Sequence, residues 1–535
     1  MMRPLRKGEE LAKLKLMRKM KTPFPPVVYA ALLGVVAFLG YWSTLAPGIV
    51  WDPASVGNLL ASLVQPRFFS FSFSPLYFLL GSLWSRLGPL SSLAFRANLV
   101  SALFASLGVS LIYLVIWEAT RDTKPAFLGG LCLAFFPQFW YFALFANFYT
   151  LAFFLFWLAL FSLFYFKERP RCALFWSVFF SALSFLCFPA AVFLLFPLGI
   201  AAWQGRGQLR FWDIVGAGLV FVVVIAAGIS VAAALGLPVR GFVFSLSPLK
   251  PVFLSSWQNA LSFAGGLLFG HWWVLLPLAG LGFIFGGGQR PALVRSLLGL
   301  FAIVAIYPLP EMPGAYLPVF SVIILWASLG FKIIWDLAWA LSDTEIGAAF
   351  KTRVFVLVFR LKKEGRALRF LVVGALSFLA AVMIAWDFPA RLSSLSRAAD
   401  TAAILYGEQA WEALPPGAIV LAEKEEYLSV LRYFEAIGKT RGVLATHPSL
   451  GFDQKEVARI CQFYPEVIVP ESLSLVETDF SALAALRDFA ARNAHDRAVF
   501  FTLSYPATGV GGRVGEWEGL SLIAEEPLYR ILGDQ

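Results

Sequence analysis

Charge is scarce in this chain. Only 14% of its 535 residues are Asp, Glu, Lys or Arg, compared with about a quarter in soluble domains. Apolar side chains make up 59% of the sequence and include 54 Phe and 18 Trp. Apolar runs long enough to cross a bilayer recur from Val27 to Trp386. This composition excludes a soluble α-helical protein and predicts a polytopic membrane protein.

Several common site signatures are also missing. The sequence contains no Gly-rich phosphate loop, no His/Cys cluster with metal-ligand spacing and no G-x-S-x-G motif. No Asp, Glu or Lys lies in the middle of an apolar run, whereas ion-coupled carriers usually place such groups there. These absences weigh against a transporter, and we expect neither a metal ion nor a cofactor.

Cysteine is rare as well. The chain has four cysteines, of which Cys132, Cys172 and Cys187 fall in apolar runs. Cys461 is the only cysteine in the C-terminal region, so that region cannot be held by an internal disulfide.

The charges that are present are unevenly divided. Residues 387–535 carry 13 basic and 21 acidic side chains, which leaves 30 basic and 12 acidic side chains for the first 386 residues. A basic membrane part is therefore joined to an acidic soluble part. The pI of about 9.4 thus reflects membrane topology rather than nucleic-acid binding.

Short basic segments mark the cytoplasmic side of a membrane protein. Here they are Arg3–Lys21, Arg121–Lys124, Lys167–Arg171, Arg206–Arg210, Arg290–Arg295 and Lys332–Arg369. Placing all of them inside predicts eleven spans, near 27–46, 95–118, 125–139, 147–166, 172–188, 190–203, 212–235, 260–285, 296–310, 315–332 and 370–386. The charged N-terminus has no A-x-A-like cleavage site after the first run, so we expect that run to be a span.

An odd number of spans with the N-terminus inside places the C-terminus outside. The predicted parts are a basic cytoplasmic N-terminus (1–26), a transmembrane domain (27–386) with an outward loop (47–94), and an extracytoplasmic domain (387–535).

The C-terminal domain alternates helical and strand patterns. The predicted helices are Leu392–Glu412, Glu426–Ile437 and Phe480–Asn493. The predicted strands are Ala418–Ala422, Gly442–Leu444, Val467–Val469, Val499–Leu503 and Leu520–Ile523. Strands separated by helices predict a small α/β domain.

The first 120 residues, and two later motifs, resemble a bacterial membrane family of the protein O-mannosyltransferase-like type. The matching residues are Thr44–Pro47, Trp51-Asp52, Pro75–Tyr77 with Leu80-Gly81, Arg96–Phe104, Asn147–Leu151 and Trp411–Ile419. The resemblance is that of a divergent member, because Ser55 and Ser70 stand where the family pattern has a glutamate and a histidine. It implies a glycosyltransferase C fold, a polyprenyl-phosphate sugar as donor and a location in the cytoplasmic membrane of a bacterium.

The resemblance also implies a chemistry. Transfer needs a carboxylate to take a proton from the acceptor hydroxyl, and cationic groups to hold the departing phosphate. Asp52 is the only acid in the loop 47–94 and is the candidate base. Arg96 is the candidate phosphate ligand, because a guanidinium can hold phosphate through two hydrogen bonds. The secondary candidates for substrate binding are Arg67, Arg240, Lys250 and Tyr77.

Each of these residues also has a structural interpretation. Asp52 followed by Pro53 fits a helix N-cap, and Arg96 fits a snorkelling anchor at the membrane surface. Asn98 fits a polar group in helix packing. Trp51 and Tyr77 fit an interfacial aromatic belt.

The resulting prediction is a membrane glycosyltransferase that moves a sugar from a polyprenyl-phosphate carrier to an extracytoplasmic protein, lipid or glycan. One alternative is a catalytically degenerate relative that binds lipid or scaffolds the cell envelope. A weaker alternative is a lipid or sugar carrier. The expected partners are the donor, membrane lipid and an unidentified acceptor, with no nucleic acid.

Overall fold

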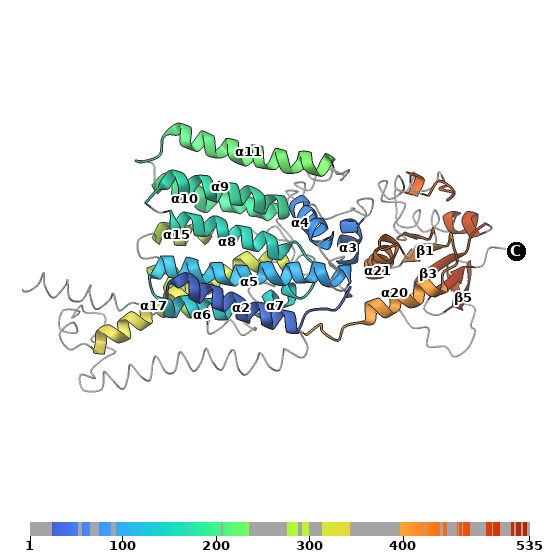
Figure 1. The fold of residues 1–535 in the computed structure, drawn as a ribbon, viewed down its shortest axis with the longest axis horizontal. Coiled ribbons are helices and arrows are strands. Elements are labelled where there is room, and N and C mark those ends of the chain that lie inside the picture. The colour runs from blue at the N-terminus through green and yellow to red at the C-terminus, as the bar shows by residue number, and fades with distance from the viewer. Residues whose placement is uncertain are drawn as a thin grey trace, which may run out of the picture.

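The computed structural model consists of a helical bundle with an α/β domain at one end (Figure 1). It describes residues 24–51, 56–64, 74–86, 92–166, 168–204, 207–234, 275–286, 291–298, 313–342, 396–422, 424–438, 442–446, 457, 460–462, 464–470, 488–494, 496–502, 515–517, 520–525 and 528–531.

The bundle is built from long apolar helices and a few short ones. Its elements are α2 (Pro26–Ser43), α5 (Leu93–Thr120), α6 (Thr123–Ala134), α7 (Pro137–Ala143), α8 (Tyr149–Tyr165), α9 (Pro170–Cys187), η2 (Pro189–Leu194), α10 (Leu195–Gln204), α11 (Phe211–Ala234), α14 (Leu275–Phe285), α15 (Pro291–Ser296), η6 (Pro313–Tyr316) and α17 (Leu317–Ser342). Two further helices, α3 (Val56–Val64) and α4 (Pro75–Arg86), belong to the loop between α2 and α5.

Five of the described helices are long and apolar enough to cross a membrane, namely α2, α5, α9, α11 and α17. The α6–α7 pair would be a sixth span, although it bends by 62°. Pro137 begins α7 and cannot continue the hydrogen-bond ladder of α6, which accounts for the bend. The polytopic helical class is confirmed, and the number of eleven spans stays a prediction.

Local sequence signals set the ends of α5. The Ser92 hydroxyl accepts a hydrogen bond from the backbone N–H of Phe95 at 3.2 Å, which caps the start of the helix. Arg121 ends it in the left-handed conformation, with φ of 56°. Asp122 then accepts a hydrogen bond from the Lys124 N–H at 3.1 Å and begins α6.

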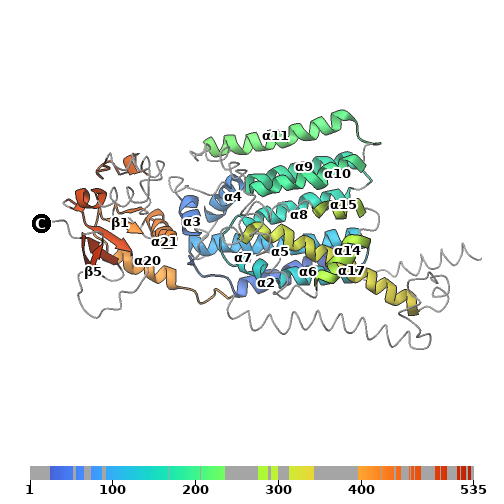
Figure 2. The ribbon, with the colours of Figure 1, turned by 180° about the vertical axis from the view of Figure 1, so that it is seen from behind.

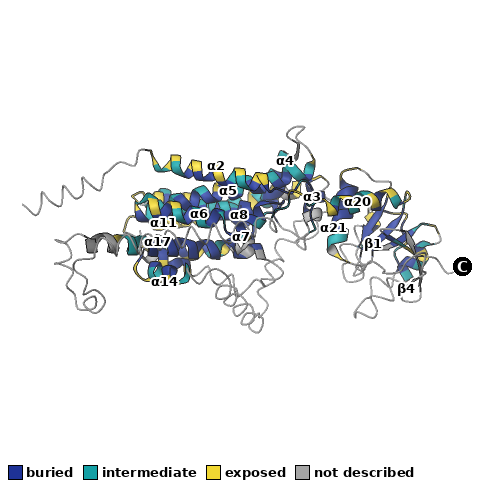
Figure 3. Ribbon diagram, turned by 90° about the horizontal axis from the view of Figure 1, so that it is seen from below, coloured by how far each residue is buried: buried dark blue, intermediate teal, exposed yellow. Residues whose placement is uncertain are grey.

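The helices of the bundle pack through small residues and hydroxyl groups. The Ser110 hydroxyl on α5 donates to the Ala30 carbonyl on α2 at 2.9 Å, and Ser177 on α9 donates to Ala159 on α8 at 2.7 Å. The outer faces of α2 and α11 are apolar and exposed, as Figure 3 shows for α2. Such faces suit contact with lipid tails.

The C-terminal domain contains one mixed sheet in the order β2-β1-β3-β6-β5-β4. Its elements are α20 (Ala402–Ala413), β1 (Ile419–Ala422), α21 (Glu425–Ala436), β2 (Leu444–Thr446), β3 (Val499–Thr502), β4 (Gly515–Trp517), β5 (Leu520–Glu525) and β6 (Leu528–Ile531). The strands β2, β1 and β3 are parallel, whereas β3, β6, β5 and β4 pair antiparallel. This arrangement confirms a small α/β domain, but β4 and β6 were not predicted.

Of the predicted elements, one helix is wrong in part and one strand is absent. Residues 396–401 are not helical, so the helix expected from Leu392 begins at Ala402. Val467–Val469 is not a strand. The Asn493 side chain accepts from the N–H of Ile468 at 2.9 Å and donates to its carbonyl at 2.8 Å. The short apolar run therefore reflects packing of Val467 and Val469 against the domain core rather than pairing in the sheet.

Two lysines of predicted cytoplasmic segments can be placed relative to the C-terminal domain. The C-terminal domain lies at the end where α3 and α4 are found (Figures 1 and 2). At the other end of α5, Lys332 lies 3.9 Å from the Asp122 carboxylate, and the Lys124 ammonium lies 3.9 Å from the Trp335 ring. Lys124 and Lys332, both from predicted cytoplasmic segments, therefore lie at the end of the bundle opposite the C-terminal domain. Which end faces the cytoplasm stays a prediction.

Candidate functional site

The residues that lead into the first loop are fixed against the bundle. Asn98 on α5 donates to the carbonyls of Ala46 and Gly48 at 3.0 and 2.9 Å, and accepts from the N–H of Ala146 at 2.8 Å. All of these groups are buried. Asn98 is therefore a packing and positioning residue, as its sequence context indicated.

Three more hydrogen bonds hold the same segment. The Trp140 indole N–H donates to the Thr44 hydroxyl at 3.0 Å, and the Ala46 N–H donates to the Leu144 carbonyl at 3.2 Å. The Ser92 hydroxyl donates to the Pro47 carbonyl at 3.3 Å. The segment 44–51 therefore approaches position 52 along a defined path.

Four of the candidate site residues lie outside the described residues. They are Asp52, Arg67, Arg240 and Lys250. Their roles stay predictions, as does the capping role considered for Asp52. The structure does describe both flanks of Asp52, which are Trp51 and the helix α3 that begins at Val56.

Arg96 lies in the first turn of α5, half-buried, at the junction with the C-terminal domain. Burial raises the pKa of Tyr433 on α21, whereas a hydrogen bond from the Ala94 backbone and the charge of Arg96 both act to lower it. A hydrogen bond that lowers a phenol pKa stabilises the oxygen anion, so the Ala94 N–H is the donor. Arg96 thus lies near a polar tyrosine of the other domain, and its role as a phosphate ligand stays a prediction.

Tyr77 on α4 does not belong to an aromatic belt, because it is only 1% exposed. Its hydroxyl interacts with the Ser101 side chain and the Asn147 backbone, but makes no well-aligned hydrogen bond to the described residues. The hydroxyls of Ser74 and Thr150 are also buried without a well-aligned hydrogen bond to the described residues. Unpaired buried hydroxyls are costly. For Tyr77 to touch a substrate, this packing would have to open.

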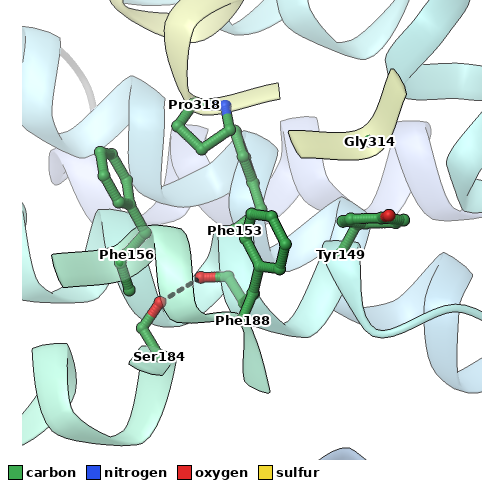
Figure 4. Close-up of a pocket in the computed structure, with 9 residues that line it drawn as sticks. Tyr149, Phe153, Phe156, Ser184, Phe188, Gly314 and Pro318 are labelled. Carbon is green, nitrogen blue, oxygen red and sulfur yellow. Dashed lines mark hydrogen bonds between the residues drawn. The ribbon is translucent and has the colours of Figure 1, made fainter. Parts of the chain in front are cut away.

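A small apolar cavity lies between α8, the α9–η2 junction and the start of α17 (Figure 4). Its aromatic wall consists of Tyr149, Phe153, Phe156 and Phe188, and Gly314 lies opposite. At about 10 Å³ the cavity has room for about one water molecule. A sugar or an isoprene unit would therefore fit only after these rings move.

Near Trp51, the C-terminal domain contributes residues that the sequence analysis did not identify. The Trp51 ring lies 5.2 Å from that of Tyr406 on α20 and 5.1 Å from that of Tyr427 on α21. The Trp51 ring therefore packs against another domain, and its place in an interfacial belt stays a prediction. The sequence periodicity of α20 and α21 indicates that these helices are buried, but it does not identify the surface against which they pack.

The chain has the glycosyltransferase C fold. It is similar to the crystal structure of ArnT from Cupriavidus metallidurans in the apo state, with a TM-score of 0.56 and 13% identity, over 95% of this chain and 99% of that chain. It is also similar to the apo oligosaccharyltransferase of Archaeoglobus fulgidus, with a TM-score of 0.50 and 13% identity, over 89% of this chain and 69% of that chain.

At such identity the similarity establishes the fold and not the activity. No protein-family model and no curated protein sequence matches the chain. The fold implied by the sequence resemblance is confirmed.

Proposed function

We propose that the protein transfers a sugar from a polyprenyl-phosphate carrier to an acceptor on the outer side of a bacterial cytoplasmic membrane. The observation that carries the proposal is the glycosyltransferase C fold over 95% of the chain. The segment leading to Asp52 and the start of α5 with Arg96 meet at one end of this fold.

In the proposed reaction, the acceptor hydroxyl attacks the anomeric carbon of the donor sugar. Asp52 takes the proton of that hydroxyl, and the bond between the anomeric carbon and the phosphate oxygen breaks. The polyprenyl phosphate leaves as an anion, which Arg96 stabilises through charge-assisted hydrogen bonds. Arg67, Arg240, Lys250 and Tyr77 are the further candidates for substrate binding. The lipid-linked sugar serves as co-substrate, and the proposal includes no cofactor or metal ion.

A second function is favoured by one observation. Ser55 and Ser70 replace two ionisable residues of the family pattern. A catalytically degenerate protein that binds lipid, or scaffolds the envelope through its C-terminal domain, accounts for those replacements.

The test is sugar transfer from a polyprenyl-phosphate donor pool by the full-length protein in liposomes. Asp52→Asn should lower transfer by about 100-fold or more, because it removes the proton acceptor. Asp336→Asn is the matched control, since Asp336 pairs with Lys332 far from the C-terminal domain. Unchanged transfer by Asp52→Asn would refute the assignment of the base. An inactive wild type that still binds labelled lipid would favour the degenerate protein.

A further inference from the structure

Three aromatic rings connect the two domains beside the candidate base. Trp51 directly precedes Asp52, and its ring packs against both Tyr406 and Tyr427. The two tyrosine rings are 5.1 Å apart, so the three rings form a closed cluster. Burial, and secondarily Tyr427, raises the pKa of Tyr406. Tyr406 therefore stays neutral at physiological pH, and the cluster acts as an apolar contact.

The other flank of Asp52 is held by the same domain. Helix α3 begins four residues after Asp52 and packs along α21. Ala61 of α3 and Ala436 of α21 are buried against each other. On the near side, a Cβ atom added to Gly48 would lie 2.3 Å from Cδ1 of Ile404 on α20. The C-terminal domain therefore contacts the loop closely both before and after position 52.

The start of α5 is the third point of contact. Ala94 is the second residue of this helix, so its N–H has no acceptor within the helix. Tyr433 on α21 lies close enough to this backbone group, two residues before Arg96, for the amide to lower the pKa of the tyrosine. One helix of the C-terminal domain thus touches both the flanks of the candidate base and the turn that carries the candidate phosphate ligand.

A polar tether lies where the chain enters the C-terminal domain. The Arg397 N–H donates to the Thr44 carbonyl at 3.0 Å, and the Arg397 guanidinium lies 5.5 Å from the Tyr141 ring. Asp400 pairs with the same guanidinium at 2.9 Å. The domain is thereby joined to the end of α2 as well.

We infer that α20 and α21 are a positioning element of the transfer site. They fix the loop that carries Asp52 relative to Arg96, with Tyr406, Tyr427 and Tyr433 as the positioning residues. This inference rests on the proposed function for its catalytic consequence, while the docking itself is independent of it. A catalytic group must be held close to its reactive geometry, and a displacement of about 1 Å can cost about 100-fold in rate. A C-terminal domain that merely follows the bundle would not need such contacts at three places around one loop.

The first test compares Tyr427→Ala with Tyr427→Phe in the full-length protein. Alanine removes the ring that packs on Trp51, whereas phenylalanine keeps it. We expect Tyr427→Ala to lower kcat about 10- to 100-fold with little change in the donor KM, and to increase hydrogen exchange in residues 44–51 and α3. Tyr427→Phe should restore both. Tyr165→Ala is the control, because Tyr165 is 56% exposed at the far end of α8.

The readouts separate the inference from the proposed function. Unchanged exchange in residues 44–51 and α3 would refute the docking. Increased exchange with unchanged kcat would refute the positioning role. If the wild type itself transfers no sugar but exchange increases in Tyr427→Ala, the proposed function fails and the docking stands.

A cross-link tests the same geometry without weakening the fold. Ala61→Cys with Ala436→Cys, in a Cys461→Ser background, should form a disulfide in membranes under mild oxidation. Transfer should persist after cross-linking if the docked arrangement is the active one. Absence of the cross-link, or its formation with loss of transfer that reduction restores, would overturn the inference.

Discussion

The bundle and the C-terminal domain bury their side chains by different rules. On α21 every residue from Leu428 to Ala436 is buried, including the charged Arg432 and Glu435, because the helix packs against α3, α20, β1 and β2. On α11 the exposed side is as apolar as the rest, with exposed residues such as Leu219 and Val222. Burial thus includes charged side chains on α21, whereas the exposed face of α11 is apolar, so polarity does not mark the packed face of either helix.

The polar groups differ in the same way. In the bundle, serine hydroxyls donate to carbonyls of a neighbouring helix, as Ser184 on α9 does to Ala152 on α8 at 2.9 Å. In the C-terminal domain, charged side chains pair at the surface, as Arg492 does with Asp488 at 2.7 Å. Without water as a competitor, the bundle uses neutral groups and close backbone contact, whereas the wet domain tolerates charge.

The largest effect should come from a helix contact that contains no side chain. A Cβ atom at Gly282 of α14 would lie 1.7 Å from the Trp326 carbonyl oxygen on α17. Gly282→Leu should therefore separate the two helices and abolish recovery of monodisperse protein in detergent. Gly280→Leu is the control, since a Cβ atom at Gly280 meets nothing within 4 Å. Equal recovery of the two variants would contradict backbone contact as the packing rule of the bundle.

A smaller loss is expected where one polar side chain serves three backbone groups. Asn98→Leu leaves the carbonyls of Ala46 and Gly48 and the N–H of Ala146 without their partner. Each buried group left unpaired costs about 1–3 kcal/mol, so thermal unfolding should occur at a clearly lower temperature. Ser106→Ala removes only a bond within α5, to Leu103, and should change the transition little. A smaller effect of Asn98→Leu than of Ser106→Ala would contradict this account.

A core truncation in the C-terminal domain tests whether this domain depends on its own apolar core. Leu431 of α21 is fully buried, and Leu431→Ala should cost about 2–5 kcal/mol. Limited proteolysis should then cleave the region 396–531 faster while the bundle stays intact. Leu405→Ala, at a residue 53% exposed, is the control. Faster cleavage throughout the bundle would show that the two parts do not unfold separately.

The smallest effect concerns one side-chain pair in the bundle. Trp157 donates from its indole N–H to the Ser321 hydroxyl on α17 at 3.0 Å. Trp157→Phe keeps most of the apolar contact and loses a hydrogen bond of about 1 kcal/mol. A modest drop in unfolding temperature is expected, and none for Trp176→Phe at a half-exposed residue. An equal drop in both variants would exclude the hydrogen bond as its cause.

Much of the bundle was predictable because spans are long and uniform. The predicted spans 27–46, 95–118 and 212–235 correspond to α2, α5 and α11 to within a few residues. The predicted end at Lys332 is less informative, because α17 continues to Ser342. Lys332 pairs with Asp336 on the next turn at 2.8 Å, so a charge that ends a span need not end a helix.

The sequence could identify the segments of the candidate site but not the contacts between them. The resemblance pointed to the loop after α2 and to Arg96, and the structure brings the described parts of both to one end of the bundle. The resemblance could not show that Tyr77 is buried, nor that Tyr433 lies near the start of α5. Those facts depend on how distant segments pack, for which a single sequence holds no local signal.

The sequence by itself determined the membrane class, the approximate bounds of α2, α5 and α11, and an α/β C-terminal domain. These properties are sums over neighbouring residues, so hydropathy and charge report them directly. Only the tertiary structure decided that Trp51 closes a ring cluster with Tyr406 and Tyr427. That contact arises from the shapes of two separately packed units, and shape complementarity becomes visible only when both are folded.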